Sequence, residues 1–332
     1  MSERKYNVAV VGATGLVGGT FLKVLKEYNF PIANLKLLAS SRSAGKVIDY
    51  NGKEIIVEEL TENSFKDIEI ALFSAGGDVS RKFAPIAAES GAVVIDNSSA
   101  FRNFDHLPLV VPEVNAFDIK AEGIIANPNC STIQAIIPVK ALSDKYGLES
   151  IQYATYQAVS GSGMKGVNDL KNTLAGEENQ FYPYPIAQTC IPEIDAFLDD
   201  GYTKEEMKMV NETRKMLHIP NLPISATCIR VPVPNCHGVL VHAQLKEEFN
   251  IDDIKELFAN YPGLKLVDDI KNHGYPTATM ANDNDLVYVG RIRKDLSVKN
   301  GVIFYTVADN IRKGAASNAV QIAEYIVKNK ML

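Results

Sequence analysis

Through the first half of the chain, short apolar runs alternate with segments that carry apolar residues at helical spacing. The continuous apolar runs, typical of strands buried on both faces of a parallel sheet, lie at residues 6–11, 35–39, 68–73, 93–96 and 123–126. Helical spacing follows at residues 21–25, 79–89 and 133–142. Asn51-Gly52 lies between alternating apolar residues and predicts a hairpin. This alternation of strands and helices predicts an α/β fold with a doubly wound, Rossmann-type parallel sheet.

The pattern changes at Glu149. Residues 151–159 alternate apolar and polar side chains, as in a sheet with one solvated or interfacial face. Further strands are expected at residues 224–233, 239–245, 286–293 and 302–308, and helices at 165–177, after a capping box at Thr203, at 251–260 and at 313–330. We therefore expect a first domain at 1–127, completed by a C-terminal helix at 311–332, and a second, α+β domain at 128–310.

Composition and charge narrow the class of protein. The 332 residues have a formal net charge of -6 and contain no block rich in Lys or Arg, which argues against a nucleic-acid partner. No apolar run approaches the roughly 20 residues of a membrane helix, and the N-terminus leads into a predicted strand without a signal peptide. The four cysteines have no regular spacing, so we expect a reducing, cytoplasmic environment without disulfides.

A glycine-rich turn follows the first predicted strand. Gly12, Gly15 and Gly18 have the spacing G-x-x-G-x-x-G and precede a helical pattern. Glycine lets the backbone approach a pyrophosphate, which then meets the free N–H groups at the N-terminus of the helix. The strand before the motif and the helix after it favour dinucleotide binding over the alternative of a simple tight turn.

Ser40, Ser41 and Arg42 follow the second predicted strand. A protein that selects NAD usually carries an acidic residue near this point. Two hydroxyls and a guanidinium suit a ribose 2′-phosphate instead, which favours NADP as the cofactor. The alternative is a solvated loop with an unrelated arginine.

The segment Asn127-Pro128-Asn129-Cys130-Ser131-Thr132 joins a short apolar run to a helical pattern. The proline forces a turn, which places Cys130 at or near the N-terminus of the helix. The backbone N–H groups and the helix dipole favour an anion there. A thiol in this position becomes a nucleophile at neutral pH. The alternative is a small buried cysteine that packs between strand and helix.

Three further residues could take part in chemistry. Arg102 follows a polar strand end and could bind a carboxylate or phosphate, or form only a surface ion pair. Arg230 lies inside an apolar strand, where its charge is costly unless it meets an anion. His237 follows in a turn, where it is either a proton-transfer group or a surface residue. A thiol, an imidazole and a nicotinamide cofactor suit aldehyde oxidation through a thioester.

The chain resembles the aspartate-semialdehyde dehydrogenase family over essentially its whole length. Eight segments occur in the family's order, and together they are far more specific than any one of them. They are the glycine motif at 12–18, Ser74-Ala75-Gly76-Gly77, Asn97-Ser98-Ser99-Ala100-Phe101-Arg102, Pro112-Glu113-Val114-Asn115, the Cys130 segment, Gln157-Ala158-Val159-Ser160-Gly161, Glu212-Thr213-Arg214-Lys215 and Arg230-Val231-Pro232-Val233.

This resemblance implies three groups of site residues and no metal. The catalytic residues are Cys130 as nucleophile, Gln157 as its orienting group and His237 as the acid/base. The substrate-binding residues are Arg230 for the α-carboxylate, Glu212 for the amino group, and Arg102, Lys215 and Asn129 for the phosphate. The cofactor-binding residues are Gly12, Thr14, Gly15, Leu16, Val17, Ser40, Ser41, Arg42, Ser74, Ala75, Gly76, Ser160, Gly161, Gly163 and Asn318.

The resemblance also implies the reaction and the assembly. The family reduces L-aspartyl-4-phosphate to L-aspartate 4-semialdehyde with release of phosphate, on the route to lysine (through diaminopimelate), methionine and threonine. The cofactor is NADP, and the protein is a cytoplasmic homodimer whose second domain supplies both catalytic residues and the interface. The chain has Ser162 where many members have alanine, which we interpret as a difference between branches of the family.

Two alternatives remain at this point. N-acetyl-glutamyl-phosphate reductase shares the fold and thiol chemistry, but its acylated amine is uncharged and would leave Glu212 without a cationic partner. Its nucleophile also commonly follows Pro-Gly, whereas Cys130 follows Pro-Asn. A non-catalytic NADP-binding regulator would not need Cys130, Gln157, Arg230 and His237 together. We interpret Cys190, Cys228 and Cys236 as structural.

Overall fold

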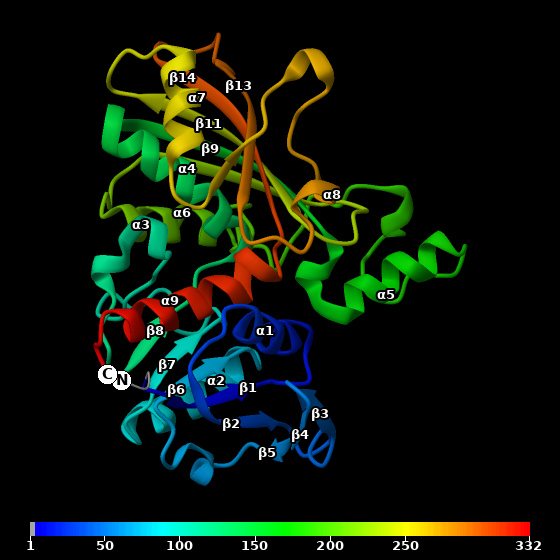
Figure 1. Ribbon diagram of the computed structural model, residues 1–332. Coiled ribbons are helices and arrows are strands. Elements are labelled where there is room, and N and C mark those ends of the chain that lie inside the picture. The colour runs from blue at the N-terminus through cyan, green and yellow to red at the C-terminus, as the bar shows by residue number, and fades with distance from the viewer. Residues whose placement is uncertain (1–3) are drawn as a thin grey trace. The chain divides into compact units, whose positions relative to one another are not determined.

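The computed structural model describes residues 4–332, which form two compact units (Figure 1). One unit comprises the described chain up to Pro128 together with Ala315–Leu332, and the other comprises Asn129–Gly314. Among residues 4–332, no helix is both long enough and apolar enough to cross a membrane.

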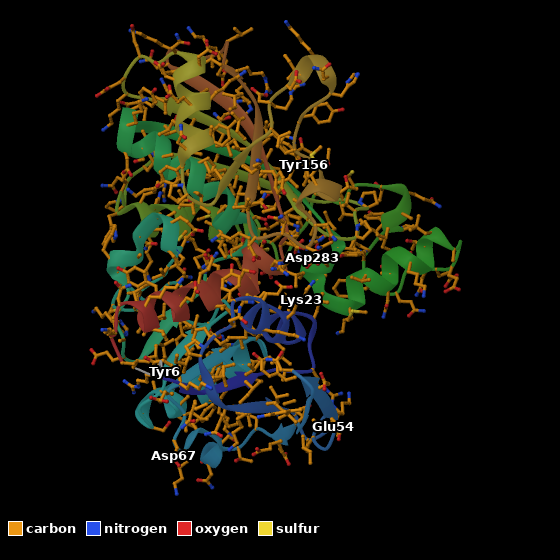
Figure 2. The ribbon with its side chains drawn as sticks, viewed as in Figure 1. Tyr6, Lys23, Glu54, Asp67, Tyr156 and Asp283 are labelled. Atoms are coloured by element: carbon orange, nitrogen blue, oxygen red, sulfur yellow. The ribbon has the colours of Figure 1, made fainter. Side chains whose placement is uncertain are left out.

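The first unit is built on a wholly parallel, six-stranded sheet with the order β5-β2-β1-β6-β7-β8. Its strands are β1 Tyr6–Val11, β2 Ile32–Ala39, β5 Glu58–Glu59, β6 Ile70–Phe73, β7 Val93–Asp96 and β8 Ile124–Ala126. Tyr6, which opens β1 and is labelled in Figure 2, is already buried. The predicted parallel sheet is therefore confirmed. Its central strands are the continuous apolar runs of the sequence.

Helices cover both faces of this sheet. On one face, α1 Leu16–Glu27 and α9 Ser317–Lys328 pack against each other and share a core with alternate residues of β1, such as Val8 and Val10. Helix α2 Gly77–Glu89 packs against β6, β7 and β8. None of its described residues belongs to that core, so α2 covers the other face. The predicted hairpin is present as β3 Val47–Tyr50 and β4 Lys53–Ile56, and α3 Pro112–Asn115 is a single short turn.

The second unit contains a mixed, six-stranded sheet with the order β10-β9-β11-β14-β13-β12. Its outer pairs, β10 with β9 and β12 with β13, are parallel, whereas the other neighbours are antiparallel. The strands are β9 Leu148–Gln157, β10 Ile224–Arg230, β11 His237–Leu245, β12 Leu264–Leu266, β13 Val287–Lys294 and β14 Gly301–Ala308.

Three helices pack against this sheet: α4 Cys130–Tyr146, α6 Lys204–Leu217 and α7 Ile251–Asn260. Two others, α5 Gly163–Leu174 and α8 Ala278–Ala281, lie in the connections. Along β9 the side chains alternate, with Tyr153 and Gln157 buried and Gln152 and Tyr156 exposed. Helices α4, α6 and α7 therefore cover one face of the sheet. The other face is open apart from the end of β14, where α8 packs beside Tyr305 and Val307.

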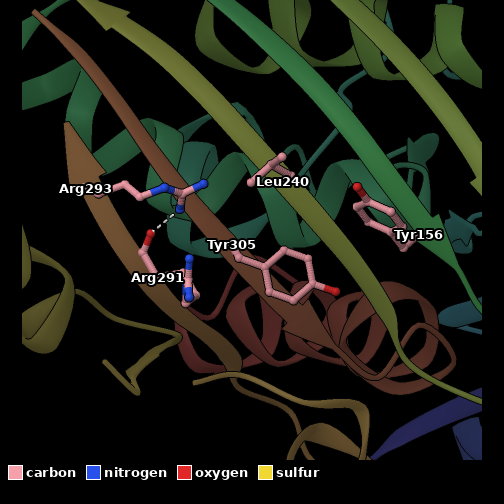
Figure 3. A pocket seen from close by; sticks show the side chains of 5 residues that line it. All are labelled: Tyr156, Leu240, Arg291, Arg293 and Tyr305. Atoms are coloured by element: carbon pink, nitrogen blue, oxygen red, sulfur yellow. Dashed lines mark hydrogen bonds between the residues drawn. The ribbon is translucent and has the colours of Figure 1, made fainter. Parts of the chain in front are cut away.

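The open face holds a pocket of about 300 Å³ (Figure 3). The pocket is lined by Tyr156, Leu240, Arg291, Arg293 and Tyr305, which come from four neighbouring strands. Arg293 donates a hydrogen bond of 2.7 Å from Nη1 to the backbone oxygen of Arg291.

Among the element boundaries that differ from the prediction, two lie near Arg230 and Gly314. The strand expected at 224–233 ends at Arg230, because Pro232 and Pro234 have no N–H to donate to a sheet. The helix expected at 313–330 is divided into a π-helical turn, Arg312–Ala316, followed by α9. The two helix types have similar apolar spacing, so the hydrophobic pattern could not separate them.

Candidate active site

Cys130 is the first residue of α4, as the sequence predicted, and its side chain is partly exposed rather than buried in the core. Asn129 is the N-cap. Its Oδ1 accepts hydrogen bonds from the backbone N–H groups of Ser131, at 3.0 Å, and Thr132, at 3.3 Å. The segment before α4 therefore places the thiol at a capped helix N-terminus, where an anion is stabilised.

Two glutamates of α6 hold Asn129. Glu212, only 1% exposed, accepts a hydrogen bond of 2.6 Å from the backbone N–H of Asn129. Glu205 accepts a hydrogen bond of 2.8 Å from the side-chain Nδ2 of Asn129. Lys215 follows Glu212 by three residues on the same helix and is partly buried. The predicted residues Glu212 and Lys215 thus lie on the helix that fastens the residue before Cys130.

Gln157 ends β9 and is buried. Its Oε1 accepts a hydrogen bond of 2.9 Å from the Thr155 hydroxyl, and its Nε2 donates one of 3.1 Å to Glu205. Because Glu205 also binds Asn129, a single carboxylate links Gln157 to the residue that precedes Cys130.

His237 opens β11 and is fully buried, which excludes the surface alternative. Its Nδ1 accepts a hydrogen bond of 3.0 Å from the backbone N–H of Ala158, whereas Nε2 has no partner within residues 4–332. This contact assigns the proton of the neutral ring to Nε2. Burial and, to a smaller extent, the charge of Arg230 lower the pKa of His237 to about 3, although the charge of Glu205 opposes the shift. His237 is therefore a neutral hydrogen-bond donor.

Arg230 ends β10 and is also buried. Its Nη1 donates a hydrogen bond of 2.6 Å to the backbone oxygen of Ala158, the residue that also binds His237. In the described part of the chain, its Nε has no partner. A Cβ at Gly161 would lie 3.0 Å from Arg230 Nη1 and 3.1 Å from His237 Nε2. Gly161, expected at the cofactor, thus borders Arg230 and His237.

A polar network holds the backbone just before His237. Cys236 has a left-handed conformation, with φ of 72°, and its N–H donates a hydrogen bond of 2.9 Å to Asn310. Asn310 in turn donates to the Ser160 hydroxyl, and that hydroxyl donates to Asn235. The hydroxyl of Ser160, predicted to bind cofactor, is therefore engaged in this network.

The three cysteines predicted to be structural, Cys190, Cys228 and Cys236, all lie in the second unit. Burial raises the pKa of the Cys236 thiol to about 12, with a further contribution from the charge of Asp309. Burial also raises the pKa of Cys228 well above its usual range. Cys190 is exposed, and none of the four cysteines forms a disulfide within residues 4–332. The two buried residues thus remain thiols at neutral pH and are unsuited to nucleophilic chemistry.

In the first unit, the glycine motif has the geometry of a nucleotide turn. Gly12 has φ of 85°, and a Cβ there would lie 2.8 Å from the backbone oxygen of Ser74. A Cβ at Gly18 would lie 2.1 Å from the backbone oxygen of Gly12, so only glycine permits this approach of α1 to β1. Gly15 is the N-cap of α1. Thr14, Gly15 and Leu16, predicted to bind the cofactor, are all exposed at this helix N-terminus.

The remaining predicted residues of the first unit range from exposed to buried, with Val17, Ser74 and Ala75 intermediate. The exposed residues include Ser40, Ser41 and Arg42, directly after β2. The buried ones are tied to their own unit. Arg102 donates hydrogen bonds of 2.8 and 2.9 Å to the backbone oxygens of Asn127 and Asn97. Asn318 donates a hydrogen bond of 2.9 Å to the backbone oxygen of Val110 and one of 2.7 Å to the side-chain oxygen of Asn127.

Sequence reasoning missed three residues beside the thiol and the imidazole. A Cβ at Gly314, in the π-helical turn, would lie 2.9 Å from the Cβ of Cys130. Gln134, one turn after Cys130, donates a hydrogen bond of 3.1 Å to the backbone oxygen of His237. Glu205 was assigned only to a helix start. No described group of His, Cys, Asp and Glu side chains is placed to hold a metal.

The chain is similar to known proteins over nearly its whole length. Residues 7–122 match the family model "Semialdehyde dehydrogenase, NAD binding domain", and residues 139–313 match "Semialdehyde dehydrogenase, dimerisation domain". The aspartate-semialdehyde dehydrogenase of Aquifex aeolicus is 52% identical over 98% of this chain and 99% of its own. The aspartate-semialdehyde dehydrogenase of Legionella pneumophila is 48% identical over 99% of this chain and 98% of its own. The solved structure of aspartate semialdehyde dehydrogenase II from Vibrio cholerae, complexed with ASA, matches with a TM-score of 0.95 and 45% identity over 98% and 99% of the two chains.

Proposed function

The chain belongs to the aspartate-semialdehyde dehydrogenase family, and from that membership we propose how its own residues carry out the reaction. The enzyme converts L-aspartyl-4-phosphate to L-aspartate 4-semialdehyde, a step of amino-acid biosynthesis. We place that step on the route to lysine, methionine and threonine. The observation that carries the proposal is Cys130 at the capped start of α4.

Cys130 is the proposed nucleophile. Its thiolate attacks the acyl carbon, the bond from carbon to the phosphate oxygen breaks, and phosphate leaves a thioester on the sulfur. A bound reduced nicotinamide supplies the hydride that reduces this thioester. The C–S bond then breaks, which releases the semialdehyde and regenerates the thiolate. The site needs a group that binds the carbonyl oxygen, because negative charge develops there in both steps.

His237 is the proposed donor to that oxygen. Its Nε2 carries the proton, since Nδ1 accepts from Ala158, and Nε2 has no partner within the described residues. A neutral imidazole can donate this hydrogen bond to the negatively charged oxygen of the tetrahedral adduct, which then collapses with the proton still on Nε2. Gln157 is proposed to orient the thiol.

Four charged residues are proposed to bind the substrate. Arg230 binds the α-carboxylate, which would supply the anion that its buried guanidinium requires. Glu212 binds the amino group, and this favours aspartyl phosphate over the uncharged amine of an N-acetylated substrate. Arg102 and Lys215, with Asn129, bind the phosphate.

Replacing the thiol tests the proposal. Cys130→Ala should abolish reduction of the oxidised dinucleotide by aspartate semialdehyde and phosphate, followed by absorbance, and should leave dinucleotide binding intact. Omitting phosphate should stop steady turnover of the unaltered enzyme, because phosphate releases the acyl group. Cys190→Ala is the control, since Cys190 is exposed and outside the site. Turnover by Cys130→Ala would refute the assigned nucleophile.

The first unit contains the NAD-binding domain of the family model. We propose that it takes a dinucleotide on the cradle formed by Gly12, Gly15 and Gly18, where a Cβ at Gly12 or Gly18 would collide with backbone. We further propose that the cofactor is NADP, because Ser40, Ser41 and Arg42 are exposed directly after β2 and offer donors to a 2′-phosphate.

Arg42→Ala tests the choice of cofactor. Loss of one charged hydrogen bond should weaken NADPH binding by about 10- to 100-fold, and NADH, which lacks the 2′-phosphate, should bind as before. Both dissociation constants are measured by the fluorescence of the bound nicotinamide. Lys46→Ala removes another exposed cation nearby and should change neither constant. Equal weakening of NADPH and NADH would show that Arg42 does not read the 2′-phosphate.

The enzyme is a homodimer, as its dimerisation domain indicates. We propose that the open face of the second unit's sheet is the interface. We also propose a cytoplasmic location, because none of the four cysteines, which all lie in the described part of the chain, forms a disulfide, as is usual in a reducing compartment.

A further inference from the structure

Glu205 lies in the first turn of α6, and its side chain is only 5% exposed. Its Oε1 accepts two hydrogen bonds, 2.8 Å from Asn129 Nδ2 and 3.1 Å from Gln157 Nε2. Its Oε2 accepts one of 2.9 Å from Lys208. One buried carboxylate therefore joins the residue before Cys130 to the end of β9.

A counterion keeps this carboxylate charged. Lys208 pairs with Glu205 at 2.9 Å and with Asp195 at 2.8 Å. Burial alone raises the pKa of Glu205, but the charge and hydrogen bond of Lys208 and the bonds from Asn129 and Gln157 outweigh it and lower the pKa to about 2. At neutral pH the ionised carboxylate of Glu205 can therefore accept hydrogen bonds but not donate them. Both amides must turn their NH2 groups toward it.

The orientation of each amide matters for the site. Because Asn129 Nδ2 faces Glu205, its Oδ1 faces the N–H groups of Ser131 and Thr132 and caps α4. Because Gln157 Nε2 faces Glu205, its Oε1 faces the Thr155 hydroxyl. Without the carboxylate, either amide could rotate, and the helix start that carries the thiol would lose part of its cap.

We propose that Glu205 is a positioning residue of the reaction, which acts through Asn129 and Gln157 and has Lys208 as its counterion. This inference rests on the proposed role of Cys130 as nucleophile. It assigns Glu205 a part that its position in a helix start does not suggest, since the capping box is made by its neighbour Glu206.

The sequence of α6 repeats this arrangement. Glu205 and Lys208 are three residues apart, as are Glu212 and Lys215, and the second pair follows the first by seven residues. Seven residues are about two helical turns, so both glutamates lie on one face of α6. Glu205 binds the side chain of Asn129 and Glu212 its backbone N–H. The helix thus holds the residue before the nucleophile at two points.

Two double variants test the proposal in a charge-neutral background. Lys208→Met removes the counterion in both. The first double variant adds Glu205→Gln, which keeps an acceptor oxygen for the two amides. The second adds Glu205→Leu, which has no acceptor. Relative to the Gln variant, the Leu variant should lose about 10- to 100-fold in kcat, because a misplaced nucleophile is costly. The KM for the dinucleotide should stay within about threefold, since none of the residues that Glu205 contacts is assigned to the dinucleotide.

A second measurement is independent of turnover. Alkylation of Cys130 by iodoacetamide, followed by mass spectrometry of its peptide, should be about two- to fivefold slower in the Leu variant than in the Gln variant, because a weakened helix start stabilises the thiolate less. Glu206→Leu is the control. It removes the hydrogen bonds that Glu206 accepts from the backbone N–H groups of Thr203 and Cys228, and should lower the melting temperature without changing kcat or alkylation.

Each result decides the question. A Leu variant that matches the Gln variant in kcat and alkylation would overturn the proposal, as would an equal loss of kcat in Glu206→Leu. If Cys130→Ala retained turnover, the proposed nucleophile would fail instead, and the alkylation rates would still report whether Glu205 positions that thiol.

Discussion

At the scale of single residues, one backbone N–H determines what His237 can do. The Ala158 N–H donates to Nδ1, so the neutral ring keeps its proton on Nε2. An imidazole held in this form cannot take the thiol proton at Nε2 until it has first given its own away. The arrangement favours a donor to the substrate oxygen over a base toward Cys130, a distinction that no sequence motif carries.

The same residue makes stability depend on pH. The pKa of His237 is lowered from 6.5 to about 3 by folding, so between these values the unfolded chain binds one more proton than the native protein. The contribution of His237 to stability is complete above pH 6.5 and is lost as the pH falls toward 3, with a slope of at most about 1.4 kcal/mol per pH unit. The difference in unfolding free energy between the unaltered enzyme and His237→Gln should therefore shrink as urea titrations move from pH 7 to pH 5. If the unfolding free energies of the two proteins changed equally with pH, the lowered pKa of His237 would be contradicted.

At the scale of helices and strands, the sequence predicts elements that depend on local pattern. The parallel strands, the glycine turn and the start of α4 all follow from neighbouring residues, such as Pro128 before Cys130. The role of Glu205 does not, because its partners Asn129 and Gln157 lie 76 and 48 residues away. Only the packing of α6 against α4 and β9 brings these groups together, so the pattern showed a helix start and nothing more.

The π-helical turn shows the same limit. Its Gly314 approaches Cys130 so closely that an added Cβ would lie 2.9 Å from the Cβ of the cysteine. The sequence has small residues at 314–318, which permit a close approach but do not show what approaches them. The partner of that approach, however, is the start of α4, which lies far away in the chain. The chemical type of these positions could be predicted, and their contacts could not.

At the scale of the whole molecule, the two sheets differ in how they are covered. Helices pack on both faces of the parallel sheet, which is why its strands are continuously apolar. The mixed sheet has helices on one face, and its β9 alternates buried and exposed side chains. Aromatic side chains such as Tyr156 and Tyr305 line the open face beside Leu240 (Figure 3). A second copy of the chain would bury these side chains.

A charge on that face should separate the dimer. Leu240 lies on β11, near the middle of the open face and partly exposed, so Leu240→Asp would bury a carboxylate without a counterion if the face is the interface. Such a charge should weaken dimerisation by about 100-fold or more, measured as the dissociation constant in sedimentation equilibrium. Leu296→Asp is the matched control, because Leu296 is 99% exposed and lies in the turn between β13 and β14. If Leu240→Asp remained as tightly dimeric as the control, the interface would have to lie on another surface, and the open face would need another explanation for its tyrosines.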